Sequence, residues 1–221
     1  DPRQARLRSL LMYRLSKSGH QETIDAALSL FNKKGVEQNA ETRQVILGIA
    51  ARHGNESQWN TIKKAYETCG FAELEMNYLV AMAQTQDEQI FNKFFEYAFK
   101  QNRVRSQDLL YIVAGSASTP FGQANTWKFF KKEQSVLLSK FGGTKDSSYQ
   151  AIFRSTAGGF CTEAKAKEVE SFFRECPDLN ADSVASLDRA IRQVVEVVRL
   201  NARLLNENRK GIDVFLTEKE F

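Results

Sequence analysis

The chain has 221 residues, of which 42% are hydrophobic and 26% charged, and its formal net charge of +4 comes from 31 basic and 27 acidic residues. A chain of this length buries enough surface to fold without metal or disulfide staples, and three cysteines are too few for a disulfide framework. The positive charge is slight and dispersed, which argues against a nucleic-acid partner, and no apolar run approaches the ~18 residues of a membrane span.

Apolar residues recur with a helical period almost throughout, and no segment alternates with period two. We therefore predict an all-α fold without a sheet. The short loops predict antiparallel helical hairpins, stacked into a HEAT-like superhelix. No linker rich in Pro, Gly or Ser divides the chain, so we expect one domain over residues 1–221. In chain order the predicted helices cover residues 3–17, 20–34, 40–53, 57–69, 72–84, 87–101, 106–117, 121–140, 146–157, 163–176, 182–206 and 208–217.

Helix boundaries are marked by capping residues. Thr85 and Glu88 have the spacing of a capping box, and Thr119 before Pro120 is typical of an N-cap followed by proline at the first helical position. Pro177 is expected to end the helix before it. Glycine can close a helix in the left-handed conformation, and five glycines lie where apolar stripes end: Gly19, Gly35, Gly54, Gly70 and Gly142.

Each cysteine lies among apolar helical residues, so we expect buried thiols and a reducing compartment. Three aromatic clusters place rings on the inward stripes and are interpreted as core, although outward rings could stack on bases or peptides. They are residues 94–97, 127–130 and 172–173. A row of arginines on the long penultimate helix is interpreted as a charged outer face, with docking to an acidic neighbour as the alternative. Its members are Arg189, Arg192, Arg199 and Arg203.

Catalytic and metal-binding patterns are missing from the chain. The two histidines, His20 and His53, lie near predicted helix ends and outside any H-E-x-x-H motif, so we interpret them as exposed or capping residues. The cysteines form no C-x-x-C pair, and there is neither a nucleophile elbow nor a P-loop. We therefore predict no catalytic residue, no metal site and no cofactor within this chain.

One stretch is more specific. Residues 104–108 (V-R-S-Q-D) precede an apolar helix and then residues 124–129 (A-N-T-W-K-F). This order resembles the R-x-Q-D … W-x-F signature in the C-terminal domain of gluzincin zinc aminopeptidases, the group that includes aminopeptidase N. Residues 7–31, 159–173 and 201–216 are similar to segments of the puromycin-sensitive branch, in the same order. The family often has tryptophans near the positions where this chain has Gln134 and Leu204, and the puromycin-sensitive branch tends to have proline where this chain has Ser106.

The resemblance implies a non-catalytic, HEAT-like domain that closes over a catalytic domain of the same polypeptide and helps to enclose peptide substrates. Zinc and its ligands are expected in that upstream domain, and none of them matches a position in this chain. The resemblance also implies a cytoplasmic parent enzyme that removes N-terminal residues from peptides. Exposed apolar surface on the excised domain predicts weak self-association.

Arg105, Gln107 and Asp108 are the candidate contact residues. Asp108 lies in a predicted first helical turn, where a carboxylate favours the helix dipole, and Arg105 can pair with a carboxylate or a backbone carbonyl. Structural bracing is our main interpretation, and contact with peptide or with the catalytic domain is the alternative. For the chain as a whole, the competing hypothesis is a free-standing α-solenoid scaffold that binds protein partners; an upstream H-E-x-x-H motif would separate the two.

Overall fold

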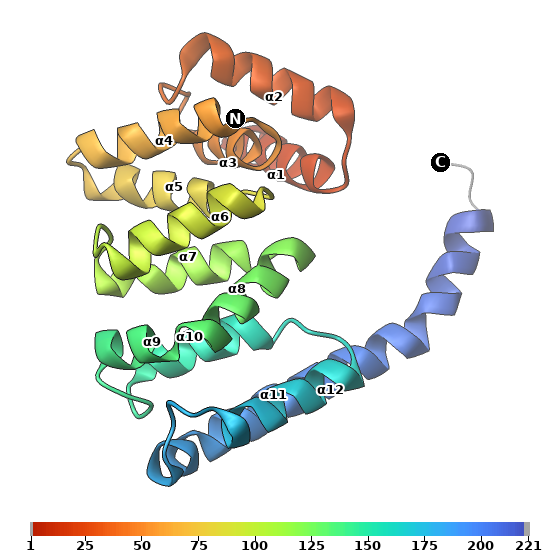
Figure 1. The fold of residues 1–221 in the computed structure, drawn as a ribbon. Coiled ribbons are helices and arrows are strands. Elements are labelled where there is room, and N and C mark those ends of the chain that lie inside the picture. Colours follow the sequence, from red (N-terminus) through yellow and green to blue (C-terminus); the bar gives the residue numbers. More distant parts are fainter. Residues whose placement is uncertain (1, 219–221) are drawn as a thin grey trace. The chain divides into compact units, whose positions relative to one another are not determined.

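The computed structural model describes residues 2–218, and within them every regular element is helical, which confirms the all-α prediction (Figure 1). The chain divides into two compact units, one ending at Ser116 and one beginning at Ala117. The single domain expected over residues 1–221 stays a prediction. In chain order the elements are α1 (Pro2–Lys17), α2 (Gln21–Lys34), α3 (Arg43–His53), α4 (Glu56–Thr68), α5 (Ala72–Met82), α6 (Glu88–Phe95), the π-helical turn η1 (Glu96–Lys100), the 3-10 turn η2 (Ser106–Asp108), α7 (Leu109–Ser116), α8 (Pro120–Lys132), α9 (Gln134–Phe141), α10 (Ser147–Ala157), α11 (Glu163–Glu175) and α12 (Ala181–Glu218).

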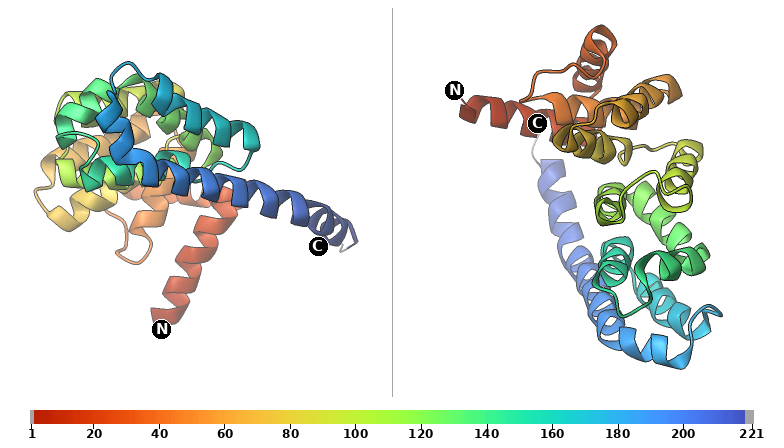
Figure 2. Two further views of the ribbon diagram at one scale, coloured as in Figure 1. Left: turned by 90° about the horizontal axis from the view of Figure 1, so that it is seen from below. Right: turned by 90° about the vertical axis from the view of Figure 1, so that its left-hand side faces the viewer.

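In the first unit, α3 packs against α2 and α5, and α4 packs against α5. Trp59 of α4 contacts both α5 and α6. Its indole Nε1 donates to the carbonyl oxygen of Met82 at 3.2 Å, and its ring packs edge-on against Phe94. Burying an aromatic side chain of this kind stabilises the fold by about 1.5–3 kcal/mol. Figure 2 shows that α1 extends away from the other helices of this unit.

The segment predicted as one helix over residues 87–101 is an α-helix followed by a π-helical turn. Its buried face carries a stack of rings in which Phe91 and Phe95 are 4.1 Å apart between centroids and Phe95 and Phe99 are 5.6 Å apart. The widened turn therefore keeps Phe99 on the same buried face, where sequence periodicity alone predicted a regular helix.

Two capping predictions have opposite outcomes. Thr119 is the N-cap of α8, where its hydroxyl accepts from the Gly122 amide and proline follows, as predicted. The Thr85–Glu88 capping box is wrong, because Asp87 caps α6 and accepts from the first amides of that helix. The Thr85 hydroxyl instead accepts from the Asp87 amide, one step outside the helix. The carboxylate stands closer to the free amides and is the stronger acceptor.

Four of the five predicted closing glycines have positive φ, and Gly54 does not. Gly54 has φ −80° and ψ −171°, so it leaves α3 in an extended conformation and the left-handed prediction is wrong there. A Cβ at this position would collide with the carbonyl oxygen of Ala50 and the side chain of Gln58. Steric room, rather than backbone handedness, requires glycine at this helix end.

The second unit is built around Trp127 and Phe130 of α8. The ring of Trp127 stacks on Phe130 at 5.7 Å between centroids and meets Phe160 and Phe172 edge-on. These contacts confirm the core role predicted for the aromatic clusters, although Phe172 itself is only half-buried. Cys161 is exposed, which contradicts the expected buried thiol, because its neighbour Phe160 occupies the inward position beside Trp127.

The other two thiols differ in depth: Cys176 is buried and Cys69 is half-buried. The Cys69 sulfur accepts a hydrogen bond from the amide of Phe71 at 3.2 Å, so this residue closes the turn after α4. α11 ends at Glu175, two residues before Pro177, as predicted.

The helix predicted over residues 121–140 is two helices that meet at Glu133, which has φ −110° and ψ 36°. Gln134 is fully buried at this bend. Its amide donates to the carbonyl oxygen of Phe130 at 2.6 Å, and its side-chain oxygen accepts from the hydroxyl of Tyr149 at 2.6 Å. One glutamine thus satisfies a backbone carbonyl at the break and a buried phenol of α10.

The two last predicted helices are one continuous helix, α12, which runs from Ala181 to Glu218. Its first half packs along α11, and every described side chain from residue 203 onward is exposed. Figure 2 shows this part of α12 extending beyond the end of α11. The arginine row faces outward as predicted, and Arg199 donates to both carboxylate oxygens of Glu163 at 3.1–3.2 Å.

Glu168 of α11 ties this helix to α8. Its carboxylate accepts from the indole nitrogen of Trp127 at 2.8 Å and from the amines of Lys131 and Lys165 at 2.6 Å each. Burial pushes the pKa of Glu168 upward, but the hydrogen bonds from Lys131, Lys165 and Trp127 outweigh it and lower the pKa to about 2. The charged form is therefore the one that the folded unit stabilises.

Replacing Gln134 with alanine leaves the buried Tyr149 hydroxyl without its acceptor. We expect a loss of about 1–3 kcal/mol in the free energy of unfolding, and a much smaller loss when Tyr149→Phe is added, since the orphaned hydroxyl is then gone. A double-mutant cycle measured by denaturant unfolding checks this. Equal losses in the single Gln134→Ala variant and in the double variant would contradict the coupling.

The contribution of Glu168 depends on pH. Because its folded pKa of about 2 lies below the ordinary value of 4.5, its stabilisation is full above pH 4.5 and is lost as the pH falls toward 2. We expect the protection of amides in α8 and α11 of the full-length protein, corrected for the intrinsic pH dependence of exchange, to fall as the pH decreases over this window, and Glu168→Gln to flatten that dependence. An unchanged pH dependence in the variant would show that other carboxylates dominate.

Candidate functional site

Arg105 and Asp108 form a compact ion pair at the start of η2. The guanidinium Nε of Arg105 donates to Oδ2 of Asp108 at 2.7 Å, and Glu75 of α5 lies 3.8 Å from the Nη2 atom of Arg105. Asp108 is only 3% exposed, whereas the side chain of Arg105 is 51% exposed. The buried carboxylate thus has a cation on its open side, and that cation also reaches toward the preceding helical layer.

Tyr66 of α4 lies against the same cluster. Burial, followed by the negative charges of Glu75 and Asp108, raises the pKa of Tyr66, so the phenol stays protonated. Its hydroxyl donates to the carbonyl oxygen of Arg103 at 3.3 Å and holds the loop before η2. These contacts support bracing as the role of the pair. Sequence reasoning did not find Tyr66 or Glu75, because both are distant along the chain.

Gln107 does not join this cluster. It lies between the two members of the ion pair in sequence, but its side chain is exposed and makes no hydrogen bond within residues 2–218. The structure therefore brings Arg105 and Asp108 together and leaves Gln107 at the surface. Whether these residues touch a peptide or another domain stays a prediction.

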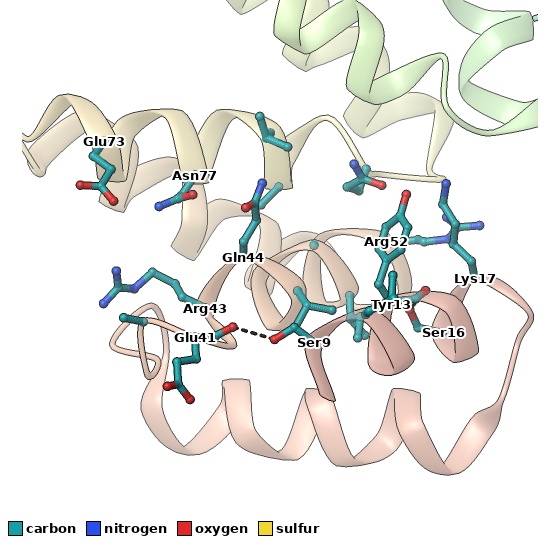
Figure 3. Close-up of a pocket in the computed structure, with 18 residues that line it drawn as sticks. Ser9, Tyr13, Ser16, Lys17, Glu41, Arg43, Gln44, Arg52, Glu73 and Asn77 are labelled. Atoms are coloured by element: carbon teal, nitrogen blue, oxygen red, sulfur yellow. Dashed lines mark hydrogen bonds between the residues drawn. The ribbon is translucent and has the colours of Figure 1, made fainter. Parts of the chain in front are cut away.

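A cavity of about 620 Å³ lies in the first unit between α1, α3 and α5 (Figure 3). Sequence analysis singled out none of its residues, because they come from three helices and share no motif. Ser9 of α1 donates to the backbone carbonyl of Glu41 at 2.7 Å across one wall. The polar or charged side chains that line the cavity are Ser9, Tyr13, Ser16, Lys17, Glu41, Arg43, Gln44, Arg52, Glu73, Asn77 and Gln84.

Arg52, near the C-terminus of α3, is the unusual member of this lining. Its Nε and Nη1 atoms are closed off from solvent and make no hydrogen bond within the described residues. Burial lowers the pKa of Arg52, yet a guanidinium remains charged at any physiological pH. Arg52 as a whole is half-buried, but these two nitrogen atoms lack both water and a protein acceptor, which is unfavourable unless something else compensates them.

The two histidines have different environments. His20 is exposed and caps α2, as predicted, with its Nδ1 atom accepting from the Thr23 amide at 3.4 Å. His53 is half-buried and its Nε2 atom is closed off without a partner, so the exposed or capping role is wrong there. Burial and then the charge of Arg52 lower the pKa of His53, so it is neutral at neutral pH.

Within residues 2–218, no group of three or more His, Cys, Asp and Glu side chains is placed to hold a metal ion. In the same part of the chain, no helix combines the length and the apolar character needed to cross a bilayer.

Comparison with known proteins identifies relatives over nearly the whole chain. The model of the ERAP1-like C-terminal domain matches residues 1–200. The puromycin-sensitive aminopeptidase of Caenorhabditis elegans is 37% identical over 99% of this chain, and the mouse aminopeptidase N is 23% identical over 91%. A glutamyl aminopeptidase from Bitis rhinoceros is 21% identical over 97%. The chain spans only 21–23% of the length of these relatives.

Removing the Arg105 side chain should destabilise the protein, since Asp108 would remain buried without its cation. We expect Arg105→Ala to lower the melting temperature of the full-length protein, with Gln107→Ala as a matched control that leaves it unchanged. The measurement is thermal unfolding of both variants beside the parent. Equal melting temperatures in all three proteins would rule out the bracing role.

Proposed function

Because the chain belongs to the family of ERAP1-like C-terminal domains, we propose that it is the non-catalytic C-terminal domain of a zinc aminopeptidase that removes N-terminal residues from peptides. The match over residues 1–200 carries this proposal. The relatives are aminopeptidases about four times as long as the chain, so the hydrolytic machinery and its zinc are assigned to the part of the polypeptide outside it.

The domain closes over the catalytic domain and helps to enclose and hold the peptide. Two exposed apolar faces support this role, because large apolar surfaces on a folded domain mark contacts with another body. One lies on α1 and the other on the distal part of α12; their members are Leu7, Leu10, Leu11, Leu15, Leu200, Leu204, Leu205, Ile212, Val214 and Leu216. The catalytic domain of the same polypeptide is the partner assigned to these faces. In the excised domain the same faces favour weak self-association.

Arg105 and Asp108 act in this proposal as a brace, and the alternative is contact with peptide or with the catalytic domain. The two roles separate in kinetics, because a brace changes stability and a contact changes the Michaelis constant for peptides. An Arg105→Ala enzyme with an unchanged melting temperature and a raised KM would favour the contact role.

The proposed location of the parent enzyme is the cytoplasm. Cys69, Cys161 and Cys176 are all free thiols, and Cys161 is exposed, which suits a reducing compartment. Fractionation of cells with an antibody against this domain tests the location directly.

The same antibody tests the function. Native protein is immunoprecipitated from a soluble cell extract, sized, and assayed for aminopeptidase activity with and without a zinc chelator. We expect a polypeptide about four times as long as this chain with chelator-sensitive activity, and no activity from residues 1–221 expressed alone. A small inactive polypeptide would instead indicate the free-standing scaffold, and the proteins that precipitate with it would identify its role.

A further inference from the structure

The cavity between α1, α3 and α5 contains a cation without a partner. Arg52 makes no ion pair and no hydrogen bond within residues 2–218, although two of its nitrogen atoms are shielded from water. The other arginine that lines this cavity, Arg43, donates to the carbonyl oxygen of Gln38, and Arg105 of the ion pair described above donates to Asp108. Nη2 is not among the shielded atoms, and with Nη1 it forms an edge of the guanidinium that can bind a bidentate acceptor.

We propose that this cavity binds a carboxylate group, with Arg52 as its anchor. A planar guanidinium matches a carboxylate with two parallel hydrogen bonds, and the match is strongest where water is excluded. A carboxylate bound to the edge formed by Nη1 and Nη2 also supplies the acceptor that the shielded Nη1 atom lacks, which recovers part of the desolvation cost of the empty site.

The charges of the lining are separated along the cavity. Figure 3 shows Arg52, Tyr13 and Lys17 at one end, while Glu41 and Glu73 lie at the other end with Arg43 and Asn77. The end that holds Arg52 thus carries two cations and no carboxylate among the labelled residues. A negatively charged group is attracted to this end and repelled from the acidic one, which fixes its orientation.

A neutral donor completes the Arg52 end. The hydroxyl of Tyr13 lies at this end and can donate to a carboxylate oxygen, and the amide of Gln44 lines the middle of the same cavity. Lys17 places its amine over the ring of Tyr13 at 4.9 Å from the centroid. The two side chains of α1 are thus held together beside Arg52.

Access to the shielded nitrogen atoms requires a side chain to move. Tyr13 and Lys17 are half-buried residues of α1 at this end of the cavity, and rotamer changes of such residues are fast and inexpensive. We assign them as the side chains that open the site. The volume of about 620 Å³ exceeds what one carboxylate needs and falls within the range of small-ligand sites, so the group belongs to a larger molecule. Its source is either a free organic acid or a carboxylate carried by a peptide.

The test uses the full-length protein and two kinds of probe. Succinate and its uncharged diamide are compared by their effect on thermal unfolding. A pentapeptide amide with one internal glutamate, its glutamine counterpart and the same glutamine peptide with a free C-terminus are compared by KM. The variants are Arg52→Met, Arg52→Lys, which keeps the charge but not the fork, and Arg8→Met, an exposed arginine of α1 that serves as the control.

In the parent and in Arg8→Met, we expect each carboxylate probe to bind about tenfold more tightly than its neutral counterpart, as judged from the shift in thermal unfolding for succinate and from KM for the peptides. We expect this difference to disappear in Arg52→Met. Arg52→Lys should lose most of it, which separates fork recognition from charge and guards against a misfolded methionine variant. A response to succinate alone identifies a free acid as the source, and a response confined to the peptides identifies a peptide carboxylate.

Equal responses of Arg52→Met and Arg8→Met to every probe would overturn the site, whatever the absolute affinities. The peptide arm rests on the proposed aminopeptidase function, whereas the unfolding arm does not. If the full-length protein proved to have no peptidase activity, the proposed function would fail while the succinate comparison still decided the carboxylate site.

Discussion

Most helices of this chain bury one face, whereas α3 is buried on most of its sides, and the packing of these faces against neighbouring helices organises each unit. Trp59 shows the principle in the first unit, since one indole both fills the space beside Phe94 and donates to the end of α5. Trp127 does the same in the second unit, packing on Phe130 while its indole nitrogen reaches Glu168 on α11. Layers of helices are thus joined by residues that are apolar in bulk and polar at one atom.

Polar side chains inside such a stack are tolerated where they are fully paired. Gln134 and Tyr149 are buried and satisfy each other together with a backbone carbonyl, and Asp108 is buried beneath Arg105. Arg52 and its neighbour His53 break this pattern, because Nε and Nη1 of Arg52 and Nε2 of His53 are shielded without a hydrogen-bond partner. A departure from an otherwise satisfied interior is more informative about ligand binding than the size of the cavity, since packed proteins rarely retain an uncompensated charge.

The exposed apolar residues of α1 and distal α12 are consistent with the family relationship. A domain that spans about a quarter of its relatives is expected to show surfaces that its neighbours cover. Leu11 on α1 and Leu204 on α12 are exposed, and the proposal assigns the catalytic domain as the partner that covers them. α12 continues as one helix beyond its contacts with α11, and every described side chain from residue 203 onward is exposed.

The sequence by itself determined the helical class, most helix positions and the cap at Thr119, because periodicity and capping depend on residues only a few positions apart. It also carried the family resemblance, through an ordered set of short motifs. Only the tertiary structure decided the bend at Glu133, the continuity of α12, the outward turn of Cys161 and the partnership of Arg105 with both Asp108 and Glu75. The cavity around Arg52 belongs to the same group, since its lining comes from three helices. These features depend on contacts between residues that are distant along the chain, and local sequence spacing does not predict such contacts.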